Sequence, residues 1–237
     1  LADKLDTIGG FFGAAMPPSG SKDPFALRRS ALGVIALISE NQLRMNLKQL
    51  LTYSQHWLRF TEGGLAGSES QLMEFFADRL KLQQREAGVR HDLIDAVFAL
   101  GGEDDLVRLL SRVTALQAFV ETGEGVNLLA GYKRAANIMK KEQWDAGAVS
   151  GADMLPDEAA LVNALDAAEP IVRAAIEAED FTAAMTALAS LRAPIDAFFT
   201  NVTVNDPDPG IRACRLTLLA RFRDAVHTVA DFSRIVG

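Results

Sequence analysis

Apolar residues recur every three or four positions along almost the entire chain. This spacing places them on one face of an α-helix, and no segment keeps the alternation of apolar and polar residues that is typical of a half-buried strand. We therefore expect an all-α protein, a helical bundle. The pattern predicts helices over roughly 2–13, 23–50, 52–60, 69–87, 90–100, 103–120, 124–143, 157–178, 180–200 and 209–233.

Proline and glycine clusters separate the predicted helices, because these residues interrupt helices and favour turns. The run from Phe198 to Val204 has the composition of a strand, but a single run forms no sheet. Two of the breaks are long enough to be domain boundaries, one around 61–68 and one at 147–156.

The composition is ordinary for a soluble globular protein, with 49% apolar and 23% charged residues among 237. No apolar run approaches the ~20 residues that cross a bilayer, and no basic segment followed by an apolar one stands at the start. The chain begins without Met, so we interpret it as a fragment of a longer cytoplasmic protein. A single cysteine, Cys214, excludes an internal disulfide framework and a multi-cysteine metal site.

The net charge of −7 argues against a nucleic-acid partner only if it is spread evenly. It is not. Residues 145–196 contain ten acidic residues and only two basic ones, Arg173 and Arg192, so the remainder of the chain sums to +1. Basic surfaces outside the acidic segment are therefore compatible with the composition.

The pair His91-Asp92 matches the core of the metal site in phosphohydrolases of the HD type. Such a site needs two more ligands, an earlier His and a later Asp. The earlier histidine would have to be His56, which lies beside Trp57 in an apolar helix. The alternative is that Asp92 starts a helix over Leu93–Leu100 and His91 lies at its start. We expect this structural role and no metal site.

The sequence also lacks the patterns of nucleophilic and nucleotide-dependent catalysis. Cys214 has no histidine near it in the sequence, and no serine stands in a strand–turn–helix context. No glycine-rich loop has the spacing of a phosphate-binding motif. We therefore expect no catalytic residue in this chain.

The segment Tyr132–Lys141 is the best candidate for binding nucleic acid. As a helix it places Lys133, Asn137, Lys140 and Lys141 on one face, with Arg134 beside them. Cations on such a face can follow a phosphate backbone, and Asn137 can read a base edge. The alternative is a solvated helix whose last cations stabilise its C-terminal dipole.

The last predicted helix carries four arginines. Arg215 falls inside its apolar stripe, so we expect it to be buried with a carboxylate partner such as Asp196. The other three are candidate RNA contacts on the surface: Arg212, Arg221 and Arg223. Phe198 and Phe199 precede this helix, and we expect them in the core, with base stacking as the alternative.

The order Lys22-Asp23-Pro24-Phe25-Ala26-Leu27-Arg28-Arg29 is more specific than a helix start requires. Asp23 can cap free backbone N–H groups, and Pro24 suits a first helical turn. Together with the preceding LADKLDTIGGFFG, this stretch closely resembles the β subunit of bacterial two-subunit glycyl-tRNA synthetases, where it ends an HD-like helical domain. The resemblance implies that Asp3 or Asp6 holds the late acidic position of that domain.

The final segments carry a second resemblance. The stretches Phe198–Asn205, Ile211–Leu216 and Val229–Ser233 are similar to the DALR-type anticodon-binding domain, an all-α bundle that this β subunit shares with arginyl-tRNA synthetases. The helix with Tyr132, Lys133, Arg134, Asn137 and Ile138 is similar to the one that opens this domain. The family more often has Asp where Thr200 stands and Asn where Cys214 stands.

The resemblance implies three parts: the end of an HD-like domain over 1–50, a helical linker region over 51–130 and a DALR-type domain over 131–237. It implies a part of glycine–tRNA ligase that binds the anticodon arm of glycine tRNA, while the α subunit uses ATP and Mg for adenylate chemistry. The implied partners are glycine tRNA and the α subunit, and neither DNA nor a membrane. Two alternatives remain: a fragment of an HD-type phosphohydrolase, and a helical interaction scaffold without affinity for RNA.

Overall fold

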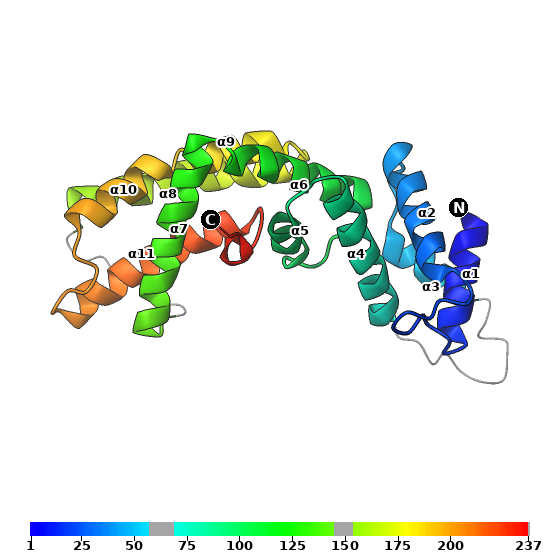
Figure 1. Ribbon diagram of the computed structural model, residues 1–237. Coiled ribbons are helices and arrows are strands. Elements are labelled where there is room, and N and C mark those ends of the chain that lie inside the picture. Colours follow the sequence, from blue (N-terminus) through cyan, green and yellow to red (C-terminus); the bar gives the residue numbers. More distant parts are fainter. Residues whose placement is uncertain (57–68, 145–153, 237) are drawn as a thin grey trace. The chain divides into compact units, whose positions relative to one another are not determined.

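The protein is all-helical in the computed structural model, which describes residues 1–56, 69–144 and 154–236 (Figure 1). Within these ranges no strand is formed, and pairing of the β type is limited to an isolated bridge between Ser19 and Lys22. The prediction of an all-α class is therefore confirmed. The predicted boundary at 61–68, and residues 147–153 of the other, lie outside the described residues.

Contacts divide the chain into two compact units. Unit 1 consists of Leu1–Ile94 and Gly102–Leu110, and unit 2 of Asp95–Gly101 and Ser111–Gly237. The predicted boundary at residue 50 falls inside a helix of unit 1, whose residues Leu47 and Leu51 are fully buried.

Unit 1 is built from amphipathic helices. In α1 (Ala2–Gly13) the buried residues Leu5, Ile8 and Phe12 recur at the helical period. Helix α1 packs closely on α3, because Gly9 leaves room for Ser54: a Cβ atom at position 9 would lie 2.3 Å from the Ser54 Oγ. The further helices of unit 1 are α2 (Leu27–Glu40), α3 (Leu47–His56), α4 (Glu69–Glu86) and the first turns of α5 (His91–Phe98) and α6 (Leu106–Val120).

The first five residues of the KDPFALRR segment form a tight loop, and its last three begin α2. As expected, Asp23 caps the helix: its carboxylate accepts hydrogen bonds from the backbone N–H groups of Leu27 (2.8 Å) and Arg28 (3.0 Å). The prediction that Pro24 lies in the first helical turn is wrong. Pro24 instead follows Asp23 in a turn that the Ala26 N–H closes on the Asp23 carbonyl, and α2 begins only at Leu27. Phe25 stacks on Phe11 of α1, with ring centroids 3.9 Å apart.

The predicted helix over 23–50 is also wrong, because α2 ends at Glu40 and α3 begins at Leu47. Gln42 adopts a left-handed conformation (φ 51°). This turns the chain so that the Leu43 N–H donates to the Ile38 carbonyl and the Gln42 N–H to that of Ser39. These two bonds form a Schellman motif, which usually contains a glycine.

Unit 2 packs its helices around an apolar core that includes Leu128, Leu161, Phe198 and Phe222. Helix α7 contacts α11, α10 and α9, while α8 contacts α9, α10 and α11 (Figure 1). The helices of unit 2 after α6 are α7 (Gly123–Glu142), α8 (Pro156–Glu177), α9 (Phe181–Ala189), α10 (Arg192–Asn201) and α11 (Pro209–His227), followed by the short 3₁₀ helix η2 (Phe232–Arg234).

Two predicted helices of unit 2 are divided or shortened. The helix predicted over 180–200 breaks between Ala189 and Arg192, because Pro194 has no N–H to donate to the carbonyl of Ser190. The helix predicted over 209–233 ends at His227. In the described part of the chain, no helix is both long and apolar enough to span a membrane.

Candidate nucleic-acid interface

Helix α7 presents the predicted basic face. Thr122 caps its start, where the hydroxyl accepts a hydrogen bond from the Gly125 N–H (3.0 Å), and the helix ends at a left-handed Gln143. One side of α7 is buried, through Leu128, Leu129, Tyr132, Ala135 and Met139. The predicted face therefore lies on the opposite side.

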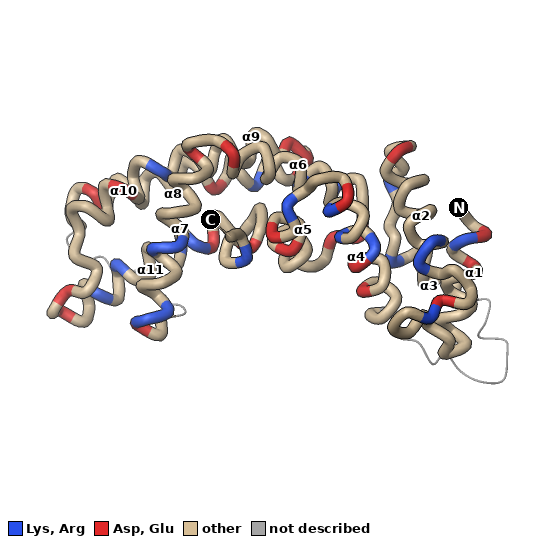
Figure 2. Tube along the Cα trace, viewed as in Figure 1, with Lys and Arg blue, Asp and Glu red and all other residues tan. Residues whose placement is uncertain are grey.

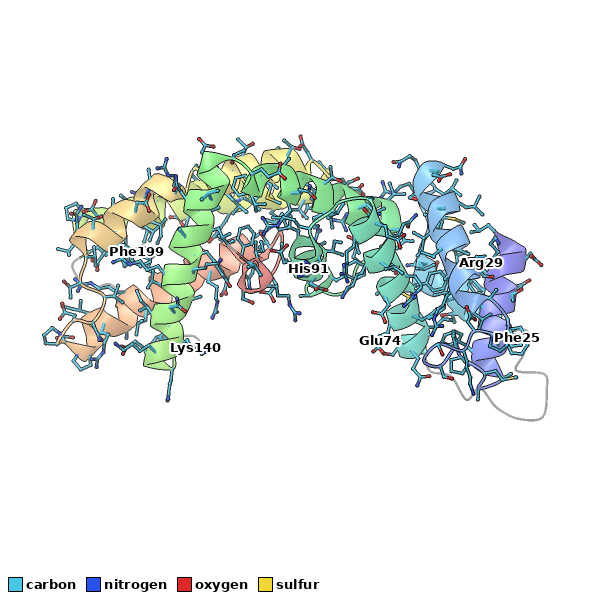
Figure 3. All side chains as sticks on the ribbon, viewed as in Figure 1. Phe25, Arg29, Glu74, His91, Lys140 and Phe199 are labelled. Atoms are coloured by element: carbon cyan, nitrogen blue, oxygen red, sulfur yellow. The ribbon has the colours of Figure 1, made fainter. Side chains whose placement is uncertain are left out.

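The cations of this face have no competing partner among the described residues. Asn137, Lys140 and Lys141 are exposed and Lys133 is half-buried. In residues 1–56, 69–144 and 154–236, no carboxylate lies within ion-pair distance of these three lysines. Figure 3 labels Lys140 near the end of α7. As far as the described residues extend, the face can therefore accept phosphate groups without first breaking an ion pair.

Arg134 behaves differently from these lysines. Its guanidinium carbon lies 4.3 Å from the centroid of the Phe199 ring, and its Nη2 donates to the Phe199 carbonyl at 3.2 Å. Phe199 belongs to α10, so Arg134 links α7 to α10 while its side chain remains exposed.

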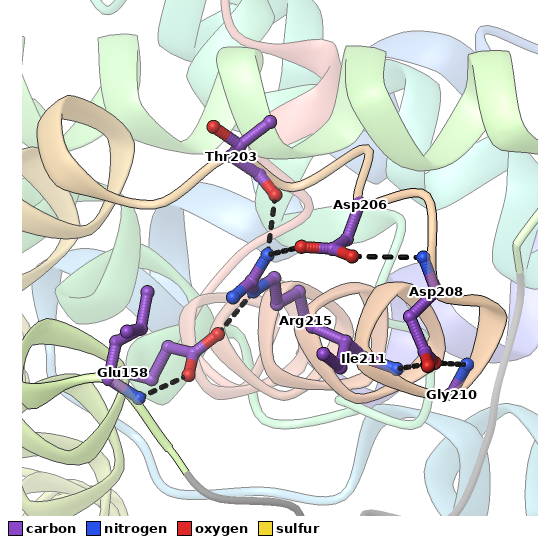
Figure 4. A network of polar contacts seen from close by, with 8 residues as sticks. Glu158, Thr203, Asp206, Asp208, Gly210, Ile211 and Arg215 are labelled. Atoms are coloured by element: carbon purple, nitrogen blue, oxygen red, sulfur yellow. Dashed lines mark hydrogen bonds and ion pairs between the residues drawn. The ribbon is translucent and has the colours of Figure 1, made fainter.

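Arg215 is buried, as the sequence predicts, but its expected partner is wrong. It donates to Glu158 at the start of α8, to the Thr203 carbonyl (2.8 Å) and to Asp206 (2.8 Å) (Figure 4). Asp196 instead pairs with Arg192. Burial alone would lower the pKa of Arg215, but the bonds and charges of Glu158 and Asp206 raise it above the ordinary value. The network ties the α10–α11 connection to α8.

The three predicted surface arginines of α11 have unequal surroundings. Arg212 is half-buried. Arg221 pairs with Glu169 (2.7 Å) and Asp166 (2.6 Å) of α8, and the hydrogen bond with Glu169 contributes most to raising its pKa. Arg223 pairs with Asp224 at 2.7 Å. RNA contacts by these arginines stay a prediction, and a contact by Arg221 would compete with two carboxylates.

A polar cluster that sequence reasoning missed holds α7 against α11. The Tyr132 hydroxyl lies 2.6 Å from Nε2 of His227, and the Tyr132 ring packs on Phe232 of η2. Burial, with the charge of Asp231, raises the pKa of Tyr132 to about 12. Burial also lowers the pKa of His227. Because the two residues are 95 positions apart, no local pattern connects them.

Comparison with known proteins agrees with this architecture. A family model described as glycyl-tRNA synthetase β subunit matches residues 1–99, and one described as DALR anticodon binding domain matches residues 128–232. The chain belongs to the glycyl-tRNA synthetase β-subunit family. Both resemblances seen in the sequence are thereby confirmed.

Curated relatives extend the match over the entire chain. The glycine–tRNA ligase β subunit of Rhodospirillum centenum is 52% identical over 244 aligned residues, which cover 100% of this chain and 34% of the relative. The β subunits of Phenylobacterium zucineum and Paracoccus denitrificans are each 49% identical, again over 100% of this chain and 34% of their own length. The chain therefore spans about a third of the curated relatives it matches, in their C-terminal part.

The DALR match begins at the second turn of α7 and ends in η2, so it includes the basic face, the Arg215 network and the Tyr132–His227 pair. The two positions that depart from the family pattern lie on helices. The Thr200 hydroxyl donates to the Asp196 carbonyl within α10 (2.8 Å), and Cys214 is half-buried on α11. Phe198 and Phe199 are buried, as expected for core residues.

The part of the chain that matches the β-subunit model contains the His91-Asp92 pair. Helix α5 begins at His91, and Asp92 is buried beside Arg90, whose guanidinium lies 2.6 Å from its carboxylate. The predicted helix start is thus confirmed. Asp3 and Asp6 are exposed on α1, and the His56 side chain lies outside the described residues. Among the described residues, no three His, Cys, Asp or Glu side chains cluster as metal ligands would.

Proposed function

We propose that this chain binds the anticodon arm of glycine tRNA as part of the β subunit of glycine–tRNA ligase, so that the acceptor end reaches the active site of an α subunit. ATP and Mg are used there, and this chain contributes no catalytic group. The setting is cytoplasmic. The observation that carries the proposal is the α7 face with Lys133, Lys140 and Lys141, which lies inside the DALR match.

The proposal assigns separate tasks to the residues of this face. Lysines neutralise phosphates without reading sequence. Asn137 reads a base: the genetic code makes the last two anticodon letters of glycine tRNA C and C, and an unpaired cytosine offers an N4 amino donor and acceptors at N3 and O2. A side-chain amide carries the matching acceptor and donor.

Replacing Lys140 and Lys141 by Ala tests the phosphate contacts. We expect weaker binding to all tRNAs and a salt dependence whose slope falls by roughly one unit per lost contact. The measurement is a filter-binding titration of the chain with glycine tRNA at several salt concentrations. The double variant Arg173→Ala with Arg192→Ala removes the same net charge from α8 and α10 and serves as the control. If the folded lysine variant keeps the wild-type affinity and slope, α7 is only a solvated face.

Replacing Asn137 by Ala tests base reading. We expect the variant to lose discrimination between glycine tRNA and the same tRNA with altered second and third anticodon letters, by about 1–3 kcal/mol. The salt slope should remain at the wild-type value, because an amide neutralises no phosphate. Equal losses for both tRNAs would contradict the assigned role. A wild-type chain with no affinity for glycine tRNA would instead favour the interaction scaffold.

A further inference from the structure

Arg134 stands apart from the other cations of α7 in how its side chain is held. The guanidinium covers the ring of Phe199, which is 8% exposed, and one of its donors is used by the Phe199 carbonyl. Figure 3 labels Phe199 on α10, beside α7. A guanidinium that lies over an aromatic ring and donates to a carbonyl is less free to follow a phosphate group than a lysine ammonium is.

Arg134 is nevertheless exposed, which leaves its side chain accessible to a ligand. Asn137 is also exposed and follows Arg134 by three positions on the same helix. Residues three apart are neighbours on a helix surface. A flat cationic surface and an amide able to hydrogen-bond a base edge therefore lie next to each other.

We propose that the outer face of the Arg134 guanidinium, held flat by Phe199, is the platform on which an unpaired base of the anticodon loop stacks while Asn137 contacts its edge. This rests on the proposed function and makes Arg134 a base-binding residue in place of a phosphate contact. Unpaired RNA bases stack on arginine planes as well as on aromatic rings, and arginine adds a cation–π contribution.

Two substitutions separate stacking from charge. Arg134→Lys keeps the charge and loses the plane, whereas Arg134→Gln loses the charge and keeps a smaller planar amide. A phosphate contact would survive better in the lysine variant, and a stacking contact in the glutamine variant. Circular dichroism and thermal unfolding of both variants show that each remains folded.

The experiment titrates the wild-type chain and both variants with glycine tRNA and with tRNAs that carry one abasic nucleotide at each anticodon-loop position in turn. We expect Arg134→Lys to weaken binding of intact tRNA by roughly five- to a hundredfold at an unchanged salt slope, and Arg134→Gln to weaken it less. At one loop position the abasic nucleotide should weaken wild-type binding and have no further effect on Arg134→Lys.

Three results would overturn the proposal. If the Arg134→Lys variant binds like the wild type and the Arg134→Gln variant loses about one unit of salt slope, Arg134 contacts a phosphate. Abasic tRNAs that affect the wild type and Arg134→Lys equally show that no base stacks there. Unchanged binding by both variants makes Arg134 only a link between α7 and α10. In all three cases wild-type binding persists, so the proposed function stands, whereas a wild-type chain that binds no tRNA refutes the function itself.

Discussion

Arg215 shows how a single charged residue is accommodated inside an apolar helix face. A buried guanidinium without partners would cost several kcal/mol. Here two carboxylates and a carbonyl surround it, and Glu158 also accepts a bond from the Leu155 N–H at the start of α8 (Figure 4). The residue therefore fixes the α10–α11 connection to α8, and its charge is not available to a ligand.

His227 has the opposite preference, because its buried surroundings favour the neutral ring. Asp231 and Asp224 favour the charged form, but burial and Arg223 outweigh them. The pKa of His227 in the folded protein is thus below 6.5, its ordinary value in the unfolded chain. At a pH between the folded and the unfolded pKa, the unfolded chain binds more protons than the folded one. Stability then rises with pH across this window and is lost as the pH falls through it.

We therefore expect the melting temperature of the wild-type chain to fall more between pH 7.5 and about pH 5 than that of a His227→Gln variant. An NMR titration of the His227 ring measures the pKa directly. A value at or above 6.5 in the folded protein would contradict the prediction, and so would equal pH responses of the two chains.

At the scale of elements, several helices are followed by a left-handed residue other than glycine. Gln42 lies just after the end of α2, Gln143 just after that of α7 and Glu179 just after that of α8, each with a φ near +55° (51°, 53° and 59°). After α4 the equivalent position is occupied by Gly88. The Gly88 N–H donates to the Arg85 carbonyl, and the Val89 N–H donates to the Gln84 carbonyl. Left-handed backbone costs a residue with a Cβ atom roughly 1–2 kcal/mol, and glycine avoids this cost.

Gln42 and Gly88 form a matched pair for testing this cost. We expect Gly88→Ala to lower the free energy of unfolding by about 1–2 kcal/mol. No atom lies within 4 Å of the added methyl group, so the effect is conformational. Gln42→Gly should raise stability by a smaller amount, since glycine is also more flexible in the unfolded chain. Urea unfolding followed by circular dichroism measures both, and a loss of stability in Gln42→Gly would contradict the argument.

Helix α8 shows the reverse case, in which a helix continues through a residue that disfavours it. Pro170 lies inside α8 and has no N–H to donate to the Asp166 carbonyl. The helix nevertheless runs from Pro156 to Glu177, with Leu161, Leu165 and Val172 buried against the neighbouring helices. Packing therefore overrides the local propensity.

At the scale of the whole molecule, the acidic and basic residues of unit 2 are concentrated on different helices. Helices α8 to α10 with their connections contain eight acidic and two basic residues, whereas α7 and α11 together contain eight basic and three acidic ones (Figure 2). Two of the basic ones, Arg215 and Arg221, are neutralised by carboxylates of α8. The net charge of −7 is thus compatible with a phosphate-binding surface on α7.

The sequence alone determined the properties that depend on local pattern. Helical periodicity determined the all-α class, the motifs around KDPFALRR and the last helices identified the family, and helical spacing located the α7 face. The apolar stripe of α11 was sufficient to predict that Arg215 is buried. Each of these follows from residues within a few turns of one another.

Only the tertiary structure decided which distant groups meet. Three contacts join residues that are more than 50 positions apart: Arg215 with Glu158, Arg134 with Phe199 and Tyr132 with His227. The first of them replaces the expected pair of Arg215 with Asp196. The break after Glu40 likewise requires a left-handed Gln42, which local propensity disfavours. Such contacts depend on how helices pack, and packing energy outweighs the local preferences from which a sequence is interpreted.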